Sequence, residues 1–156
     1  MKLVIGCDEA AYRLKMILLE HLKKKHPGVT VTDLGAGEGE AVLYPDVAFA
    51  VADAVAAGEY ERGILLCGTG VGMAICANKV PGIRAAVCHD PYSTERSRKS
   101  NDAQIMCMGE RVIGTELAKC LVDIWLRCDF AGGGSAPKVA EIQRLEQVHI
   151  QKAARR

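Results

Sequence analysis

The strongest chemical feature of the sequence is a thiol that comes directly before a glycine-rich turn. An apolar run at residues 63–67 ends at Cys67, and residues 68–72 read Gly-Thr-Gly-Val-Gly. Backbone N–H groups and a helix dipole stabilise a thiolate placed between a strand and a helix. Such a thiolate can act as a nucleophile or as a base that abstracts a proton. The alternative is that Cys67 only closes a packed strand, since free cysteines are often buried.

The turn after Cys67 is suited to holding an anion. Gly68, Gly70 and Gly72 let backbone amides approach a phosphate or a developing enediolate. The spacing is neither the G-x-G-x-x-G of dinucleotide sites nor a P-loop, which would end in Gly-Lys-Ser/Thr. A plain strand-to-helix turn would explain one or two of these glycines, but not all three.

Adjacent carboxylates follow the first predicted strand. Asp8 and Glu9 could bind sugar hydroxyls or carry a proton between two oxygens. An alternative for Asp8 is that it caps the next helix.

Further candidates follow later strands. His89 comes after the fourth strand, and the helix beyond it ends near Ser100 and Asn101. Arg111 and Lys138 are candidate phosphate contacts, although isolated cations are more often solvated surface residues. The other three histidines, His21, His26 and His149, fall on predicted helix surfaces or ends and give no functional prediction.

The elements that must position these residues alternate regularly along the chain. Strands are predicted at residues 2–6, 29–34, 63–67, 83–88 and 103–108. Helices are predicted at residues 12–25, 45–58, 91–99 and 115–127, with a short one ending at 79 and a last one at about 138–152, after a flexible link at 131–135. This alternation predicts an α/β fold with a parallel sheet covered on both faces. Ligands of such sheets bind beyond the carboxyl ends of the strands.

Length and composition restrict the class of protein. A chain of 156 residues suits a single domain, residues 1–156. The formal net charge of +1 argues against nucleic acid, and no apolar stretch is long enough for a membrane span. The seven cysteines form no C-x-x-C pair, which indicates reduced thiols in a cytoplasmic protein and argues against zinc. We therefore expect no metal and no cofactor.

Six short motifs make the chain resemble the type B ribose-5-phosphate isomerases and the galactose-6-phosphate isomerases. The matching segments are residues 6–8, 44–46, 67–72, 77–85, 101–102 and 109–114, and the match extends in order from about residue 3 to 145. The resemblance implies a Rossmann-like three-layer αβα fold with a five-stranded sheet. It also implies a homodimer or homotetramer with active sites shared between subunits, the C-terminal segment 136–156 being at the interface. The implied reaction is an aldose–ketose isomerisation of a phosphosugar through a cis-enediol.

The resemblance also implies roles for individual residues. Cys67 would move a proton between C1 and C2, while Thr69 and the amides of Gly68 and Gly70 would hold the enediolate oxygen. Substrate contacts would come from Asp8, Tyr44, Asn101 and Arg111, with help from the C-terminal segment around Lys138.

Three departures from the family pattern bear on the substrate. Glu9 and Ser100 stand where the ribose-type pattern has histidines, and the second of those histidines helps to open the furanose ring. The chain also has Gly134 and Lys138 where the pattern has two arginines. Serine has no pKa suited to ring opening, and lysine lacks the bidentate fork of arginine.

These departures favour an open-chain substrate, with erythrulose 4-phosphate and erythrose 4-phosphate as the interconverted pair. The alternative is ribose 5-phosphate and ribulose 5-phosphate, with His89 or Glu9 opening the ring. A non-catalytic sugar-phosphate-binding subunit and a flavodoxin-like redox protein are weaker alternatives. The presence of Cys67 argues against the former.

Overall fold

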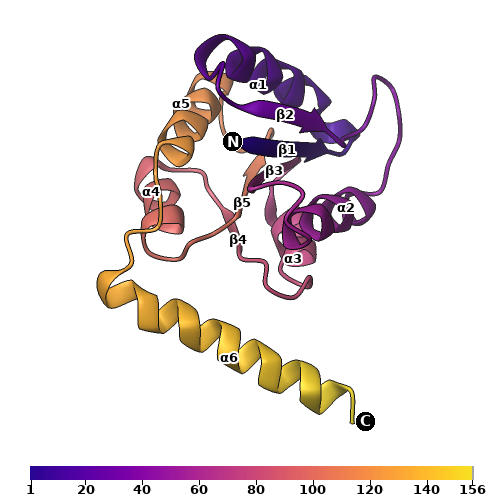
Figure 1. Ribbon diagram of the computed structural model, residues 1–156. Helices are drawn as coiled ribbons and strands as arrows, with labels where there is room; N and C mark the ends of the chain where they lie inside the picture. Colours follow the sequence, from indigo (N-terminus) through magenta and orange to yellow (C-terminus); the bar gives the residue numbers. More distant parts are fainter. Residues whose placement is uncertain (156) are drawn as a thin grey trace.

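A five-stranded parallel sheet forms the frame of the molecule (Figure 1). The structure is a computed structural model that describes residues 1–155. The strands are β1 (Lys2–Cys7), β2 (Thr30–Asp33), β3 (Arg62–Cys67), β4 (Ala85–Val87) and β5 (Ile105–Gly109), in the spatial order β2-β1-β3-β5-β4. All four neighbouring pairs are parallel, which confirms the predicted α/β fold.

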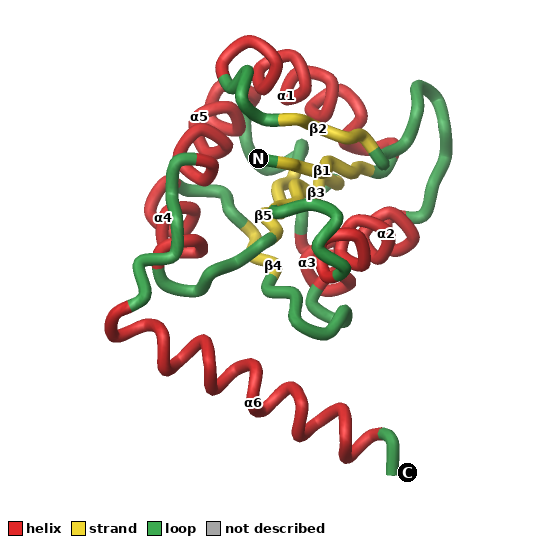
Figure 2. The backbone as a smooth tube through the Cα atoms, viewed as in Figure 1, coloured by secondary structure: helices red, strands yellow, loops and turns green. Residues whose placement is uncertain are grey.

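Six α-helices connect or extend these strands (Figure 2). They are α1 (Tyr12–Lys25), α2 (Tyr44–Ala56), α3 (Val71–Ala77), α4 (Pro91–Lys99), α5 (Thr115–Leu126) and α6 (Ala136–Ala153). Two 3₁₀ turns, Glu9–Ala11 and Gly133–Ser135, precede α1 and α6. Within residues 1–155, no helix is both long and apolar enough to cross a membrane.

The fourth strand is shorter than predicted because its flanking residues are bonded elsewhere. The N–H of Ile83 closes a turn on the carbonyl of Val80, and the N–H of Arg84 donates to the side chain of Gln104. The fifth strand likewise begins late, since the N–H of Ala103 caps α4 by donating to Ser97. These groups are therefore unavailable to the strand ladders.

Alternation along the strands builds one apolar layer on each face of the sheet. Leu3, Ile5, Ile64 and Leu66 pack with apolar residues of α1 and α5. The intervening residues, among them Leu65, pack with α2 and α3 on the other face. Because successive side chains point to opposite faces, Cys67 lies on the α2 and α3 side. The predicted three-layer arrangement is confirmed, and α6 alone projects away from it (Figure 1).

The strand order reverses next to the first predicted site residues. The chain passes from β1 to β2 on one side and then returns to β3 on the other side of β1. A reversal of this kind opens a crevice at the carboxyl ends of the two strands. Asp8 follows β1 and Gly68 follows β3, so both stand at this switch point.

Candidate active site

Cys67 lies at the carboxyl end of β3, with its sulfur directed at the turn before α3. The N–H of Gly70 donates a hydrogen bond to the Cys67 Sγ at 3.0 Å. Gly70 takes the left-handed conformation, with φ +76°, which turns its amide back toward the strand end. An N–H dipole aimed at sulfur stabilises negative charge there. The thiol is 6 % exposed and belongs to the apolar cluster between the sheet and helices α2 and α3.

Three other thiols have environments that disfavour ionisation. Burial raises the pKa of Cys7 to about 11, although the charge of Lys15 opposes the shift. Burial also raises the pKa of Cys88, and that of Cys107 well above its ordinary value. All three thiols therefore remain protonated near neutral pH, which makes them unsuited to act as bases.

An unsatisfied carboxylate oxygen lies at the same edge of the sheet. Asp8 Oδ1 is buried and has no hydrogen-bond partner among residues 1–155. Burial and the neighbouring charge of Glu9 raise the pKa of Asp8, while the backbone N–H groups of Ala10 and Ala11 and the charge of Arg111 oppose them. Contact with the N–H groups of the first helical turn therefore still leaves Oδ1 without a partner. A buried acceptor without a partner is costly, and the hydroxyl group of a ligand would satisfy it.

Arg111 is held against the glycine turn. Its backbone N–H donates to the carbonyl of Gly68 at 3.1 Å. Its guanidinium lies over Gly68: a Cβ added to Gly68 would be in van der Waals contact with Arg111 Nη1, at 3.5 Å. This places an exposed, permanently charged group beside the turn that carries Cys67.

Thr69 and Tyr44 lie at the turn that follows Cys67. The Thr69 Oγ1 accepts a hydrogen bond from the N–H of Val71 at 3.3 Å, so the hydroxyl proton stays free to donate to a ligand. The ring of Tyr44, at the first position of α2, lies against Gly72. A Cβ at Gly72 would come within 2.6 Å of that ring, which explains the glycine there.

His89 and Glu9 are both engaged with the backbone. The His89 Nε2 accepts a hydrogen bond from the N–H of Gly109 at 2.9 Å. Burial lowers the pKa of His89 despite the nearby charge of Asp90, so the ring is neutral near pH 7 and carries its proton on Nδ1. Glu9 is exposed, and its Oε2 accepts from the N–H of Val42 at 3.4 Å.

Three predicted contacts lie at the opposite edge of the sheet. Because α4 runs back from the end of β4 to the start of β5, Ser100 and Asn101 lie beside the amino ends of these strands. Arg84, the residue before β4, donates to the carbonyl of Asn101 at 2.9 Å. The N–H of Ala131 donates to the carbonyl of Lys99 at the end of α4, and this contact holds the chain at the amino edge shortly before α6 begins. Lys138, in the first turn of α6, therefore starts from the same end of the sheet. One chain therefore does not bring these three residues to its own Cys67.

Two side-chain arrangements at this amino edge were not predicted from the sequence. Arg96 donates to the Ser100 Oγ through Nε, at 2.8 Å, and also through Nη2. His21 and His26 both bond the carboxylate of Asp123, which is 102 and 97 positions away along the chain. Separations this large carry no local signal, so only the packing of α1 on α5 reveals the contact.

Comparisons with known proteins place the chain in one family. A family model described as Ribose/Galactose Isomerase matches residues 3–142. Ribose-5-P isomerase B of Listeria innocua is 55 % identical over 147 residues, which cover 94 % of this chain and 98 % of that protein. D-erythrulose-4-phosphate isomerase of Pectobacterium atrosepticum is 54 % identical over 147 residues, covering 94 % and 95 %.

A solved structure supports the same assignment. The ribose-5-phosphate isomerase B of Clostridium thermocellum superposes with a TM-score of 0.91 at 48 % identity, over 96 % of this chain and 99 % of that one. The family match spans most of the chain, including the switch point and the Cys67 turn. The chain therefore belongs to the ribose/galactose isomerase family.

Proposed function

We propose that this protein interconverts the aldose and ketose forms of a short phosphosugar, with Cys67 as the base. The observation that carries the proposal is the hydrogen bond from the Gly70 N–H to the Cys67 Sγ, at 3.0 Å. The thiolate removes a proton from C1 of the bound ketose, and the electron pair forms a cis-enediol. Return of the proton to C2, with transfer of the O1 proton to O2, yields the aldose.

The remaining groups supply binding and charge stabilisation. The Gly70 amide is occupied by sulfur, so the Thr69 hydroxyl becomes the donor to the enediolate oxygen. Asp8 accepts a hydrogen bond from a sugar hydroxyl through its unpartnered oxygen. Glu9 carries the proton between oxygens, and Arg111 binds the phosphate. None of these steps requires a metal or a cofactor.

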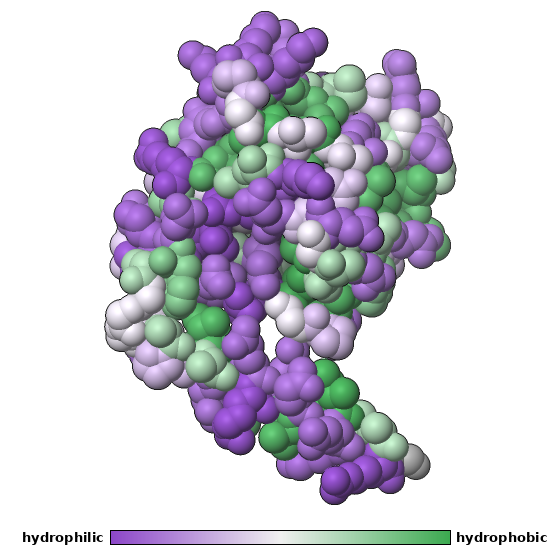
Figure 3. All heavy atoms as spheres, in the orientation of Figure 1, coloured by the Kyte–Doolittle hydropathy of each residue, from purple (hydrophilic) through white to green (hydrophobic). Residues whose placement is uncertain are grey.

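Two subunits complete each site in this proposal. Ser100, Asn101 and Lys138 lie at the amino edge, so they reach a Cys67 only in a second copy of the chain. The projecting helix α6 exposes Ile142, Leu145 and Ile150, and apolar side chains gather along it in Figure 3. Such side chains are more stable when a partner covers them. A homodimer, alone or paired into a tetramer, would both cover α6 and close the sites.

Mixing two inactive variants tests the shared site. We expect Cys67→Ala and Asn101→Ala each to lose most activity as homo-oligomers. In a symmetric dimer, co-refolding equal amounts makes half of the dimers mixed, and each mixed dimer has one intact site. The mixture should recover roughly a quarter of the wild-type activity. Activity no higher than that of the separate variants would show that each site belongs to one chain.

The proposed substrate pair is erythrulose 4-phosphate and erythrose 4-phosphate. The esterified O4 of a tetrose 4-phosphate cannot close a five-membered ring, so no acid is needed to open one. The groups available are poorly suited to the proton transfer that opens a ring. Ser100 stands where the family pattern has a histidine. His89 is neutral, and its Nε2 already accepts the N–H of Gly109. Relatives of nearly equal identity carry the names of both the ribose and the erythrulose enzymes. The alternative substrate pair is ribose 5-phosphate and ribulose 5-phosphate.

A panel of phosphosugars separates the two substrates. We expect kcat/KM for erythrulose 4-phosphate to exceed that for ribose 5-phosphate by at least about ten-fold, because only the latter needs ring opening. The Ser100→His variant should raise the ribose 5-phosphate rate and leave the tetrose rate nearly unchanged. A wild-type preference for ribose 5-phosphate would refute the open-chain assignment without affecting the isomerase proposal.

A further inference from the structure

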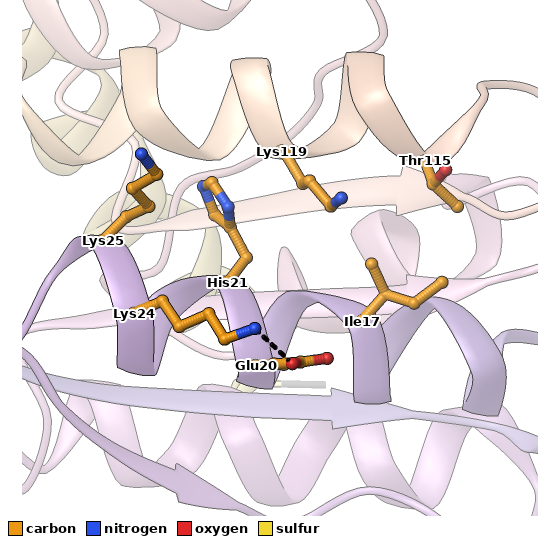
Figure 4. Close-up of a pocket in the computed structure, with 7 residues that line it drawn as sticks. All are labelled: Ile17, Glu20, His21, Lys24, Lys25, Thr115 and Lys119. Carbon is orange, nitrogen blue, oxygen red and sulfur yellow. Dashed lines mark hydrogen bonds and ion pairs between the residues drawn. The ribbon is translucent and has the colours of Figure 1, made fainter.

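Two histidines and an aspartate meet between α1 and α5, away from the Cys67 edge of the sheet. His21 and His26 come from the end of α1, and Asp123 comes from the last turns of α5. Both Nε2 atoms approach the same carboxylate oxygen, Asp123 Oδ1, at 2.6 Å and 2.7 Å. Figure 4 shows the His21 ring extending from α1 toward α5. The side chains are 11 %, 24 % and 38 % exposed, so an ion can enter from solvent.

The geometry is close to that of a metal site. One ligand atom from each of the three residues lies within 4.8 Å of the other two. Zinc binds imidazole nitrogen and carboxylate oxygen at about 2.0–2.2 Å, so tetrahedral ligands stand roughly 3.3 Å apart. The present nitrogen–oxygen distances need to open by only about 0.6 Å to reach that value. Rotations of the three side chains can supply such a shift, and water would take the fourth position.

The chemistry of the donors fits a borderline transition metal. Two imidazoles and one carboxylate are the ligand types that bind Zn²⁺ and its neighbours Co²⁺ and Ni²⁺. Burial raises the pKa of Asp123, but the hydrogen bonds from His26 and His21 outweigh it and leave the pKa below its ordinary value. The carboxylate is therefore ionised, as a ligand must be. Neutral imidazoles need only move their proton from Nε2 to Nδ1 to free the coordinating lone pair.

The surrounding charge does not block a cation. His21 lines a surface pocket between α1 and α5, which Figure 4 shows. Lys24 and Lys119 line the same pocket, and each is paired with a carboxylate. The Lys24 Nζ lies 2.6 Å from Glu20, and the Lys119 Nζ lies 2.7 Å from Glu116. Lys25 contributes an exposed positive charge, which solvent and salt screen.

We propose that His21, His26 and Asp123 form a binding site for a divalent transition-metal ion of the zinc type. The ion would join the end of α1 to α5 and act on stability, because the site lies at the amino edge and Cys67 at the carboxyl edge. This site is independent of the proposed isomerase chemistry, which requires no metal.

Cobalt titration of the chelator-treated protein tests the proposal. We expect one Co²⁺ per chain, with the visible absorption of a four-coordinate ion and without the near-ultraviolet band that thiolate ligands produce. Asp123→Asn and His26→Gln should each weaken binding by more than about ten-fold. His149→Gln, an exposed histidine on α6, should bind as tightly as the wild type. A thiolate band, the absence of saturable binding, or equal binding by all three variants would overturn the assignment.

Unfolding in urea provides a readout that also separates this site from the catalytic one. Free Zn²⁺ at one hundred times its Kd should raise the ratio of folded to unfolded protein by about one hundred-fold. Asp123→Asn should show no such increase, because it lacks the carboxylate ligand. Isomerase activity should be the same with and without chelator. A urea midpoint that zinc does not move would contradict the site, whatever the activity assay shows.

Discussion

The Cys67→Ala variant is expected to lose isomerase activity by about 10²–10⁴-fold, the range typical of removing a general base. Alanine removes the atom that takes the proton, while the fold should persist because Cys67 is the last residue of β3 and alanine is a smaller apolar residue. Serine should fail as well, because its hydroxyl is far less acidic than a thiol.

The measurement should follow both conversion and proton exchange. Wild-type enzyme in deuterated water should introduce deuterium at C1 or C2 of the phosphosugar, and the variant should not. Cys120→Ala is the matched control, since Cys120 is an exposed cysteine on α5. Undiminished exchange by Cys67→Ala would assign proton abstraction to another group, and binding without exchange in the wild type would favour a non-catalytic subunit.

The Gly70→Ala variant is expected to lose both stability and activity. An alanine in the left-handed conformation costs about 1–2 kcal/mol. Its Cβ would also lie 2.9 Å from the backbone carbonyl carbon of Met108 on β5, which is held between β3 and β4 and cannot move away. Crowding of this kind adds roughly 1–3 kcal/mol. We therefore expect a total loss of about 2–5 kcal/mol in the free energy of unfolding, measured in urea.

Gly58→Ala separates the two contributions. Gly58 has the same φ of +76°, but nothing lies within 4 Å of the position of its Cβ. It should lose only the conformational part, about 1–2 kcal/mol, and keep full activity. Gly70→Ala should be inactive even where it is folded, because the displaced amide no longer donates to the Cys67 Sγ. Equal losses in both variants would mean that the contact with Met108 is unimportant.

Sequence pattern alone predicted the fold class and the candidate residues at the carboxyl ends of the strands. Apolar runs of strand length alternate with amphipathic helices, and burial on both faces of a parallel sheet requires that pattern. Residues at strand ends follow directly from it, so Asp8, Cys67 and Arg111 were predicted before any coordinates. The boundaries of β4 and β5 were not predicted. The N–H of Arg84 donates to the Gln104 side chain and the N–H of Ala103 donates to the carbonyl of Ser97, so neither joins the ladder.

Tertiary structure decided how the individual groups are used. The sequence placed Gly70 in the turn, but only the folded backbone directs its amide to sulfur rather than to a substrate oxygen. Likewise, only the crossover of α4 places Ser100 and Asn101 at the amino edge, away from the Cys67 of the same chain. The contact of His21 and His26 with Asp123 depends wholly on the packing of α1 against α5. Local periodicity records which face of an element is buried, whereas contacts between distant elements depend on how those faces meet.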